Sequence, residues 1–427
     1  MANDPVSPDA IAACLATLDA LRALDADDPR VIAVDRAAAH LRKAARKVRR
    51  AARREVRGQA DRALAAGSAR PAAYFAIAPA APDRSRITHT TQRCYVCKQR
   101  YRELHGFYHL LCPDCGARHF AARSDTADLT GRRALVTGGR IKIGFELARK
   151  LAAAGAEVSV TTRFPADARR RFAEAELADR VEVIGLDFRD LRGVLAWIDG
   201  ELGRGRPLDI LINNAAQTVR RPAAYDAPLL AAERAALARP PGPAPAPEAA
   251  LMFPGELDQE GQPLDLRPTN SWVLGAEDVE PVELVEVHAI NAIAPFLLAS
   301  RLRPLFTRSR FADRYIVNVS AMEGVFAYRN KQPRHPHTNM AKAALNMFTR
   351  TSAADYARDG IYMNSVDTGW ITQENPWPKK QRLDAAGFCP PLDLVDGAAR
   401  VLAPVFRGVR GAPVAGLLFK DYEPAAW

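Results

Sequence analysis

Four cysteines lie close together in the first third of the chain, at a spacing that suits a metal site. Cys94-x-x-Cys97 is followed, after 14 intervening residues, by Cys112-x-x-Cys115, and the second pair sits in the tight turn L-C-P-D-C-G. Two such pairs place four thiolates around one tetrahedral Zn2+ at about 2.3 Å. Four thiolates leave no open coordination position, so the expected zinc is structural. Unligated thiols are the alternative.

The segment that holds these cysteines, residues 88–122, is expected to form a small zinc-ribbon-like module. So short a segment buries little core, and the metal therefore supplies its folding energy. His105 and His109 lie between the pairs as competing ligands, but four cysteines already complete the site. The chain starts without a basic region followed by an apolar core, which predicts a cytoplasmic protein, where clustered cysteines favour a metal over disulfides. Cys14 and Cys389 are isolated.

A glycine-rich turn, G-G-R-I-K-I-G at 138–144, follows a predicted strand at 134–137. Such a turn lets the backbone approach a pyrophosphate, and the next helix presents free N–H groups to the negative charge. Glycine turns also serve packing alone. Here the strand before the turn, the helix after it and a second strand, E-V-S-V-T-T, complete a βαβ unit, so we predict a dinucleotide site.

This region resembles the short-chain dehydrogenase/reductase family, whose turn is T-G-x-x-x-G-x-G. Thr137, Gly138 and Gly144 match that pattern, whereas Lys142 stands where the middle glycine belongs. The departure either changes how the turn meets the pyrophosphate or adds a direct contact from Lys142 to a phosphate.

Further motifs follow in the order that the family keeps, across residues 129–427. They are L-D-F at 186–188, where the family has the Asp beside the adenine; N-N-A-A at 213–216, similar to the N-N-A-G segment of the central sheet; Asn291 within a helix; Ser320 at the end of the strand Y-I-V-N-V-S; and V-D-T-G-W-I-T at 366–372, with Thr368 in place of the proline of the nicotinamide loop. The resemblance implies a Rossmann fold that binds a nicotinamide cofactor. The cofactor contacts that we expect are Thr137, Gly138, Gly139, Arg140, Ile143, Gly144, Arg163, Asp187, Phe188, Asn214, Ala215, Lys342, Thr368 and Thr372.

Charge argues for NADP(H) over NAD(H). NAD sites usually place an acidic residue at the end of the second strand to hold the ribose hydroxyls. That strand ends here in T-T-R, which gives Arg163, and Arg140 lies in the nearby turn. Two guanidinium groups suit a 2′-phosphate. The alternative is two solvated surface arginines.

The family's acid, the tyrosine of Y-x-x-x-K, is absent. The matching string is T-N-M-A-K at 338–342, so Thr338 replaces the tyrosine and Lys342 is retained. An aliphatic hydroxyl is a far weaker acid than a phenol, so Thr338 can hydrogen-bond a carbonyl but donates a proton poorly. Candidate replacements are His335, His337 and Tyr328, although a histidine here can also simply cap the helix.

The elements that must position these residues alternate between strand and helix. Short apolar strands are predicted at 134–137, 158–162, 181–186, 209–213, 315–320, 362–366 and 416–419, and helices near 144–154, 166–178, 189–202, 282–303, 338–358 and 395–406. This order predicts an α/β fold with a doubly wound parallel sheet over residues 125–427. Residues 217–280 contain R-P-P-G-P-A-P-A-P and show no clear strand or helix. We interpret them as an insertion, either a lid over the substrate or a partner surface.

Residues 1–82 are expected to form a helical arm, broken at Asp27-Asp28-Pro29, and a linker from Gly67. Much of the chain's net charge of +11 lies on this arm, because residues 36–57 hold ten Lys or Arg and one Glu. A basic, Ala-rich helix without interleaved aromatics is more often solvated, or packed on an acidic protein partner, than bound to nucleic acid. The sequence shows no uninterrupted apolar run of about 18 residues, so no membrane span is expected.

These features predict an NADP(H)-dependent oxidoreductase acting on a small carbonyl or alcohol substrate, as a homo-oligomer. Ser320, Asn291, Lys342, Thr338 and His337 are its expected catalytic residues. The alternative is a catalytically silent NADP-binding scaffold whose zinc module and basic helix engage a protein or nucleic-acid partner.

Overall fold

The computed structural model describes residues 6–68, 86–239, 247–258, 262–328 and 331–427. Internal contacts divide the chain into two units. Unit 1 comprises Met1–Ala65 with Thr88–Thr91, and unit 2 comprises Ala66–Ile87 with Gln92–Trp427. Most of the predicted linker, and most of the proline-rich stretch, fall outside the described residues.

Unit 2 is built on a sheet of eight strands in the order β10-β9-β8-β7-β6-β3-β4-β5. The strands are β3 (Arg133–Thr137), β4 (Glu157–Thr162), β5 (Val181–Gly185), β6 (Ile210–Asn213), β7 (Arg314–Ser320), β8 (Ile361–Asp367), β9 (Leu418–Lys420) and β10 (Glu423–Ala425). All pairs are parallel except β9 with β10. The seven predicted strands and the doubly wound parallel sheet are confirmed; β10 was not expected.

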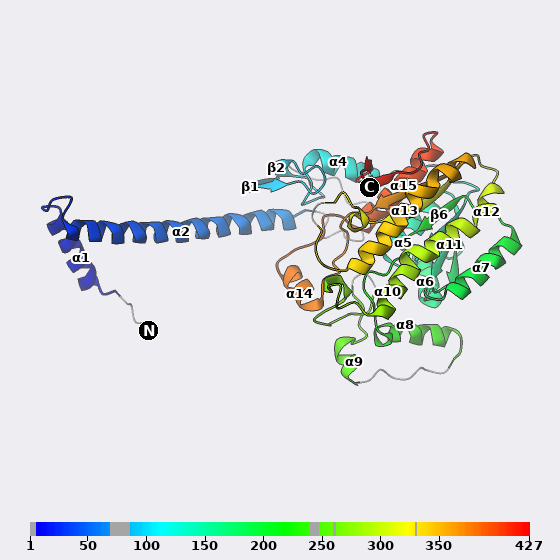
Figure 1. The fold of residues 1–427 in the computed structure, drawn as a ribbon, viewed down its shortest axis with the longest axis horizontal. Helices are drawn as coiled ribbons and strands as arrows, with labels where there is room; N and C mark the ends of the chain where they lie inside the picture. Colours follow the sequence, from blue (N-terminus) through cyan, green and yellow to red (C-terminus); the bar gives the residue numbers. More distant parts are fainter. Residues whose placement is uncertain (1–5, 69–85, 240–246, 259–261, 329–330) are drawn as a thin grey trace. The chain divides into compact units, whose positions relative to one another are not determined.

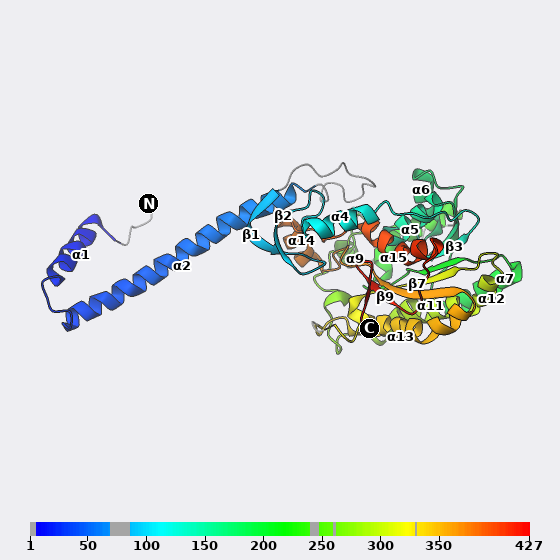
Figure 2. The same ribbon diagram turned by 90° about the horizontal axis from the view of Figure 1, so that it is seen from above.

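Helices cover both faces of this sheet (Figures 1 and 2). One layer contains α5 (Lys142–Ala153), α6 (Pro165–Glu174) and α15 (Leu394–Val409); the other contains α7 (Leu191–Arg204), α10 (Pro281–His288), α11 (Ala294–Arg301), α12 (Arg303–Thr307) and α13 (Pro336–Arg358). Each layer has its own apolar core, centred on strand residues such as Val136 and Val160 on one face and Leu135 and Leu211 on the other. The strands read as continuous apolar runs because both faces are buried.

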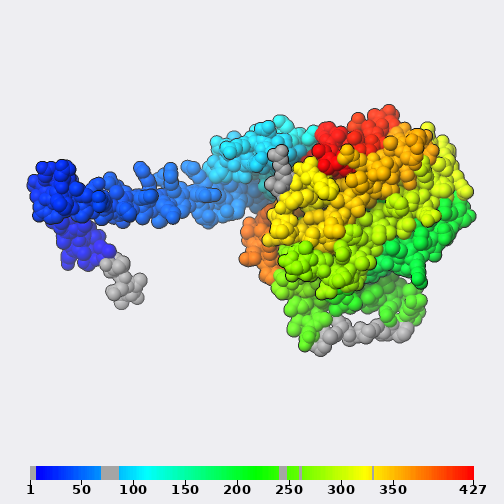
Figure 3. Space-filling model, in the orientation of Figure 1, coloured from blue at the N-terminus to red at the C-terminus, as the bar shows by residue number. Residues whose placement is uncertain are grey.

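The expected helix at 282–303 is interrupted. A π-helical turn, η2 (Ala289–Ile293), separates α10 from α11. Residues Pro281–Arg301 are long and apolar enough to cross a membrane by length and composition, although the sequence analysis did not single them out. Half of that stretch is buried in unit 2, and the core helix of a globular domain meets the same criteria. The stretch packs beside α13, and both reach the surface shown in Figure 3.

The insertion differs from its prediction, because residues 217–280 contain helices. These are α8 (Ala223–Ala236), α9 (Pro247–Met252) and the short η1 (Ser271–Val273). α8 carries Pro228 in its interior. Because proline disfavours the interior of a helix, this segment was not predicted to be helical. Another unpredicted helix, α14 (Trp377–Ala385), follows β8.

The cysteines lie among three elements: β1 (Arg86–Arg93), β2 (Arg100–Leu104) and α4 (Pro113–Ala122). β1 and β2 form a two-stranded antiparallel sheet. Residues 92–122, which belong to unit 2, are called the cysteine module below.

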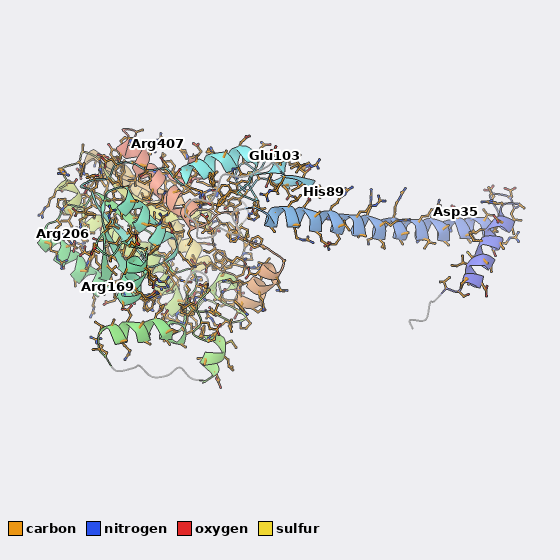
Figure 4. All side chains as sticks on the ribbon, turned by 180° about the vertical axis from the view of Figure 1, so that it is seen from behind. Asp35, His89, Glu103, Arg169, Arg206 and Arg407 are labelled. Atoms are coloured by element: carbon orange, nitrogen blue, oxygen red, sulfur yellow. The ribbon has the colours of Figure 1, made fainter. Side chains whose placement is uncertain are left out.

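Unit 1 consists of α1 (Pro8–Leu21), α2 (Pro29–Ala66) and residues Thr88–Thr91. The helical arm and its break before Pro29 are confirmed. Leu41, Val48 and Val56 form an exposed apolar stripe along α2, and Figure 4 shows side chains projecting all round that helix, among them Asp35. Within this unit, Asp61 accepts hydrogen bonds from the backbone N–H groups of His89 and Thr90, at 2.6 and 2.9 Å.

Candidate active site and metal centre

A cleft of about 1060 Å³ opens at the carboxyl ends of the parallel strands in unit 2. This is where doubly wound sheets bind their ligands. The predicted site residues that line it are Gly138, Arg140, Ile143, Gly144, Arg163, Asp187, Phe188, Asn214, Ala215, Ser320, Thr338, Lys342, Thr368 and Thr372. Four of the residues predicted to be catalytic or to bind the cofactor do not line the cleft: Thr137, Gly139, Asn291 and His337.

Close backbone packing shapes the glycine-rich turn. A Cβ atom on Gly144 would lie 2.1 Å from the carbonyl oxygen of Gly138, so the turn admits no side chain there. The Asn214 side chain donates to the carbonyl oxygens of Thr137 and Gly138, at 3.0 and 3.2 Å. Lys142, where the family's middle glycine is expected, has φ +54°, a left-handed conformation that favours glycine. The backbone therefore keeps a glycine-like geometry although the residue is a lysine.

The two arginines expected at the 2′-phosphate line the cleft, and both are paired with carboxylates. Arg140 is buried and lies 2.7 Å from Asp167. Arg163 lies 3.2 Å from Asp226 of α8, and its side chain is about one-third exposed. The insertion thus contributes a carboxylate to this end of the cleft, which the sequence analysis did not foresee.

Ser320, Thr338 and Lys342 line the same cleft: Ser320 ends β7, and Thr338 and Lys342 lie on α13, which contacts that strand. The hydroxyl oxygens of Ser320 and Thr338 are buried and have no hydrogen-bond partner within the described structure. The Lys342 ammonium donates to the carbonyl oxygen of Val319, at 2.7 Å. Burial lowers the pKa of Lys342 to about 8, against an opposing effect of the Glu323 charge. Two unsatisfied hydroxyls in a cleft that an ammonium also lines fit a ligand oxygen, because buried polar groups normally have partners.

The three candidate replacements for the missing tyrosine, His335, His337 and Tyr328, have different surroundings in the structure. His337 is buried away from the cleft, and its Nε2 lies 3.2 Å from the Glu283 carboxylate. His335 does line the cleft, but its ring stacks on Trp272 at 4.1 Å and burial lowers its pKa. Tyr328 lines the cleft and is partly exposed.

Asn291 lies in the π-helical turn and faces the start of the insertion. Its side chain accepts from the backbone N–H of Gln217 at 2.7 Å and donates to the same residue's carbonyl oxygen at 3.0 Å. Both ends of the amide are therefore satisfied by one residue, and Asn291 positions the chain where the insertion begins.

A group of charged residues in the wall of the cleft was missed by the sequence reasoning. Glu323, Asp367 and Lys420 all line the cleft, and Lys420 lies 2.8 Å from Asp367. Glu323 lies in the short helix η3 (Met322–Gly324), which packs on α13 so closely that a Cβ on Gly324 would lie 2.7 Å from Lys342. Burial raises the pKa of Glu323. The position of Glu323, three residues after Ser320, was the feature of the sequence that could have identified it as a cleft residue.

The four cysteines converge as their spacing predicted. Their sulfur atoms all lie within 4.8 Å of one another, and the Sγ atoms of Cys97 and Cys112 are 3.7 Å apart. Tetrahedral bonds of about 2.3 Å to zinc place sulfur atoms about 3.8 Å apart. The donor set therefore fits a four-thiolate metal site.

Two family models match the chain in sequence order: that of short chain dehydrogenase over residues 132–228, and that of enoyl-(acyl carrier protein) reductase over residues 274–383. An uncharacterized protein of Acanthamoeba polyphaga mimivirus is 32% identical over 341 residues, which cover 73% of this chain and 71% of that protein. Galactitol 2-dehydrogenase of Rhizobium johnstonii is 28% identical over 57% of this chain and 73% of its own length. A crystal structure of NADPH-bound carbonyl reductase from chicken fatty liver aligns with 70% of this chain and 100% of its own, at 19% identity and a TM-score of 0.46. The chain is a member of the short-chain dehydrogenase/reductase family of oxidoreductases.

Proposed function

We propose that this protein is an NADP(H)-dependent oxidoreductase that interconverts a small carbonyl compound and its alcohol. One observation carries the proposal: the unpartnered hydroxyls of Ser320 and Thr338 line the same cleft as Lys342. Bound NADPH supplies the hydride for the carbonyl carbon, and the carbonyl oxygen takes up a proton. The two hydroxyls donate hydrogen bonds to that oxygen and stabilise the negative charge that develops on it.

The proton comes from Lys342 in this proposal. Thr338 and Lys342 are one turn apart on α13 and so share a helix face. In the proposed step the Lys342 ammonium turns from the carbonyl oxygen of Val319 to the Thr338 hydroxyl, which has no partner in the structure. Thr338 then passes its proton to the substrate oxygen as it takes one from Lys342, so it relays the proton and does not itself act as the acid. Lys342 is left as an amine and regains its proton from solvent. A pKa of about 8 suits this step, because a general acid works best when its pKa lies near the operating pH.

NADP(H) is the proposed cofactor because Arg140, Arg163 and Arg189 all line the cleft, where their guanidinium groups would suit a 2′-phosphate. A 2′-phosphate would compete with the carboxylates of Asp167 and Asp226 for the first two of these. Fluorescence titration with NADPH and NADH tests the choice, and tighter binding of NADH contradicts it.

Turnover is tested on a panel of carbonyl and polyol substrates with NADPH and NADP+. Activity that is lost in Lys342→Met and Thr338→Val, with NADPH binding retained in Thr338→Val, supports the proposal. Binding of NADPH without turnover of any substrate supports the silent scaffold instead. The exposed apolar stripe of α2 is the observation that favours that second candidate, as a surface for a protein partner.

The cysteine site is proposed to hold structural zinc, and the protein to reside in the cytoplasm, where the thiols stay reduced. Metal analysis of the purified chain, with one zinc per protein as the expected result, tests the first point.

A homo-oligomer is proposed through the surface of α10, α11 and α13. Val285 of α10, Phe296 of α11 and Met347 of α13 are 66%, 49% and 58% exposed, and both α10 and α11 contact α13. Clustered exposed apolar side chains of this kind mark interfaces. Val285→Glu together with Phe296→Glu should convert the oligomer to a monomer in sedimentation analysis, whereas Leu41→Glu in unit 1 should not.

A further inference from the structure

The cysteine module contacts both loops that face the cofactor. Its buried core includes Phe107, Tyr108 and Leu111, and it continues into Ile371 of the loop after β8. Ile143 of the glycine-rich turn packs against the same cluster. Ile143, Ile371 and the module's Tyr95 all line the cleft. A module that served only to bind a structural metal would not need to pack against these two loops.

One hydrogen bond joins the module to the loop 367–372. The hydroxyl oxygen of Tyr95 accepts from the backbone N–H of Trp370, at 2.8 Å. The preceding residue, Gly369, has φ +79°, and its N–H donates to the Asp367 carboxylate at 2.8 Å. Two successive N–H groups of the loop are therefore held by side chains, one from β8 and one from the module. Tyr95 thus helps to fix the loop that the family places at the nicotinamide.

The metal site in turn holds Tyr95. This residue lies between the ligands Cys94 and Cys97, and its backbone N–H donates to the carbonyl oxygen of Leu110 at 2.8 Å. The backbone N–H of Cys94 donates to Gln99 at 2.9 Å. A ligated metal would lock both cysteine pairs, and with them the backbone on each side of Tyr95.

The module is also anchored to α15 of the same unit. The hydroxyl of Tyr108 donates to Asp396 at 2.5 Å, and Arg123, directly after the module, lies 2.7 Å from Asp393. Both aspartates form the capping box of α15. These buried contacts hold the module in place without Tyr95, so removal of its hydroxyl leaves the fold supported.

We propose that Tyr95 is a positioning residue for the cofactor loop, and that through it metal binding and NADPH binding are coupled. The inference rests on the proposed NADP(H) function. Coupling is reciprocal by thermodynamic necessity: if the metal raises the affinity for NADPH, then NADPH raises the affinity for the metal by the same factor. The module is then part of the cofactor site and not an appended partner-binding domain.

The test uses the full chain with its metal bound, and compares Tyr95→Phe with Tyr101→Phe. Tyr101 belongs to the same module, but its hydroxyl donates to the carbonyl oxygen of His109 and it does not line the cleft. Two quantities are measured for each protein: the Kd for NADPH, and the rate at which a chromophoric chelator removes zinc, with and without NADPH. The melting temperature and zinc content provide controls for folding.

In wild type, NADPH should slow zinc release. Tyr95→Phe should raise the Kd for NADPH about fivefold, the factor for a hydrogen bond of about 1 kcal/mol, and should reduce the protection of zinc by NADPH. Tyr101→Phe should change neither. An unchanged Kd and undiminished protection in Tyr95→Phe overturn the proposal, as does purified protein without metal. If wild type binds no NADPH, the proposed function fails first and this inference fails with it.

Discussion

The ammonium of Lys142 lies 3.5 Å from the carboxylate of Glu374, and this ion pair joins the glycine-rich turn to the segment after the loop 367–372. The hydroxyl of Thr372 donates to the same carboxylate, at 2.8 Å. The nearby Lys142 charge lowers the pKa of Glu374 to about 2, so the pair stays charged at neutral pH. A cofactor phosphate at the turn would compete with Glu374 for this lysine.

If a cofactor phosphate displaces Glu374 from Lys142, substitutions of these two residues should have opposite effects on the Kd for NADPH. Lys142→Ala should raise the Kd for NADPH about fivefold or more, through loss of a charge-assisted contact. Glu374→Gln should lower it, because the competing anion is removed. Fluorescence titration at low and at physiological salt measures both. Arg410→Ala serves as the control, because it removes an exposed charge paired with Asp125 and neither residue lines the cleft. Equal Kd values in all four proteins would contradict this role of Lys142.

Cofactor choice should depend on Arg163. Arg163→Ala is expected to weaken NADPH binding about tenfold while leaving NADH binding nearly unchanged, because only NADPH carries the 2′-phosphate. Asp226→Asn should have the reverse effect on NADPH, since it frees Arg163. Parallel titrations of both cofactors give the ratio of the two affinities. A ratio that Arg163→Ala leaves at its wild-type value would refute the assignment.

The rate of carbonyl reduction should fall as the pH rises through about 8. Reduction needs the Lys342 ammonium, and burial has lowered its pKa to about 8, so above that pH the acid is lost tenfold per pH unit. Alcohol oxidation, which needs the amine, should rise over the same range. Glu323→Gln should move the fall to lower pH, because the Glu323 charge holds the pKa of Lys342 up. The measurement is kcat/KM between pH 6 and 9.5, with NADPH binding followed in parallel.

A profile that stays flat across this range, with binding intact, would remove Lys342 as the proton source. Complete loss of activity in Glu323→Gln at every pH, with NADPH bound normally, would transfer that role to Glu323.

Loss of one metal ligand should destabilise the chain. Cys97→Ser is expected to abolish stoichiometric zinc and to lower the melting temperature by about 5 °C or more, because the short module depends on the metal for its folding energy. Cys14→Ser is the matched control, since Cys14 is exposed and isolated in α1. Zinc analysis and calorimetry give the two readouts. Equal stability of the two variants would argue against a structural metal.

Local patterns made the fold and much of the site predictable. The apolar strands were found within two residues because burial on both faces leaves continuous apolar runs. The cysteine pairs and the glycine-rich turn were found because each is a local motif whose spacing carries its geometry. The insertion was misjudged at α8, since a proline in the helix interior masks its periodicity.

The sequence by itself determined the alternation of strands and helices that predicts a parallel sheet, the glycine-rich turn and the four-cysteine cluster, because each is a pattern of residues that are near in the chain. Only the tertiary structure decided which distant side chains meet. In the structure His337 contacts Glu283, Asn291 holds Gln217, the Glu323 charge acts on Lys342, and Tyr95 of the cysteine module contacts Trp370. Such contacts depend on how helices and loops pack across the sheet, and no spacing along the chain encodes that packing.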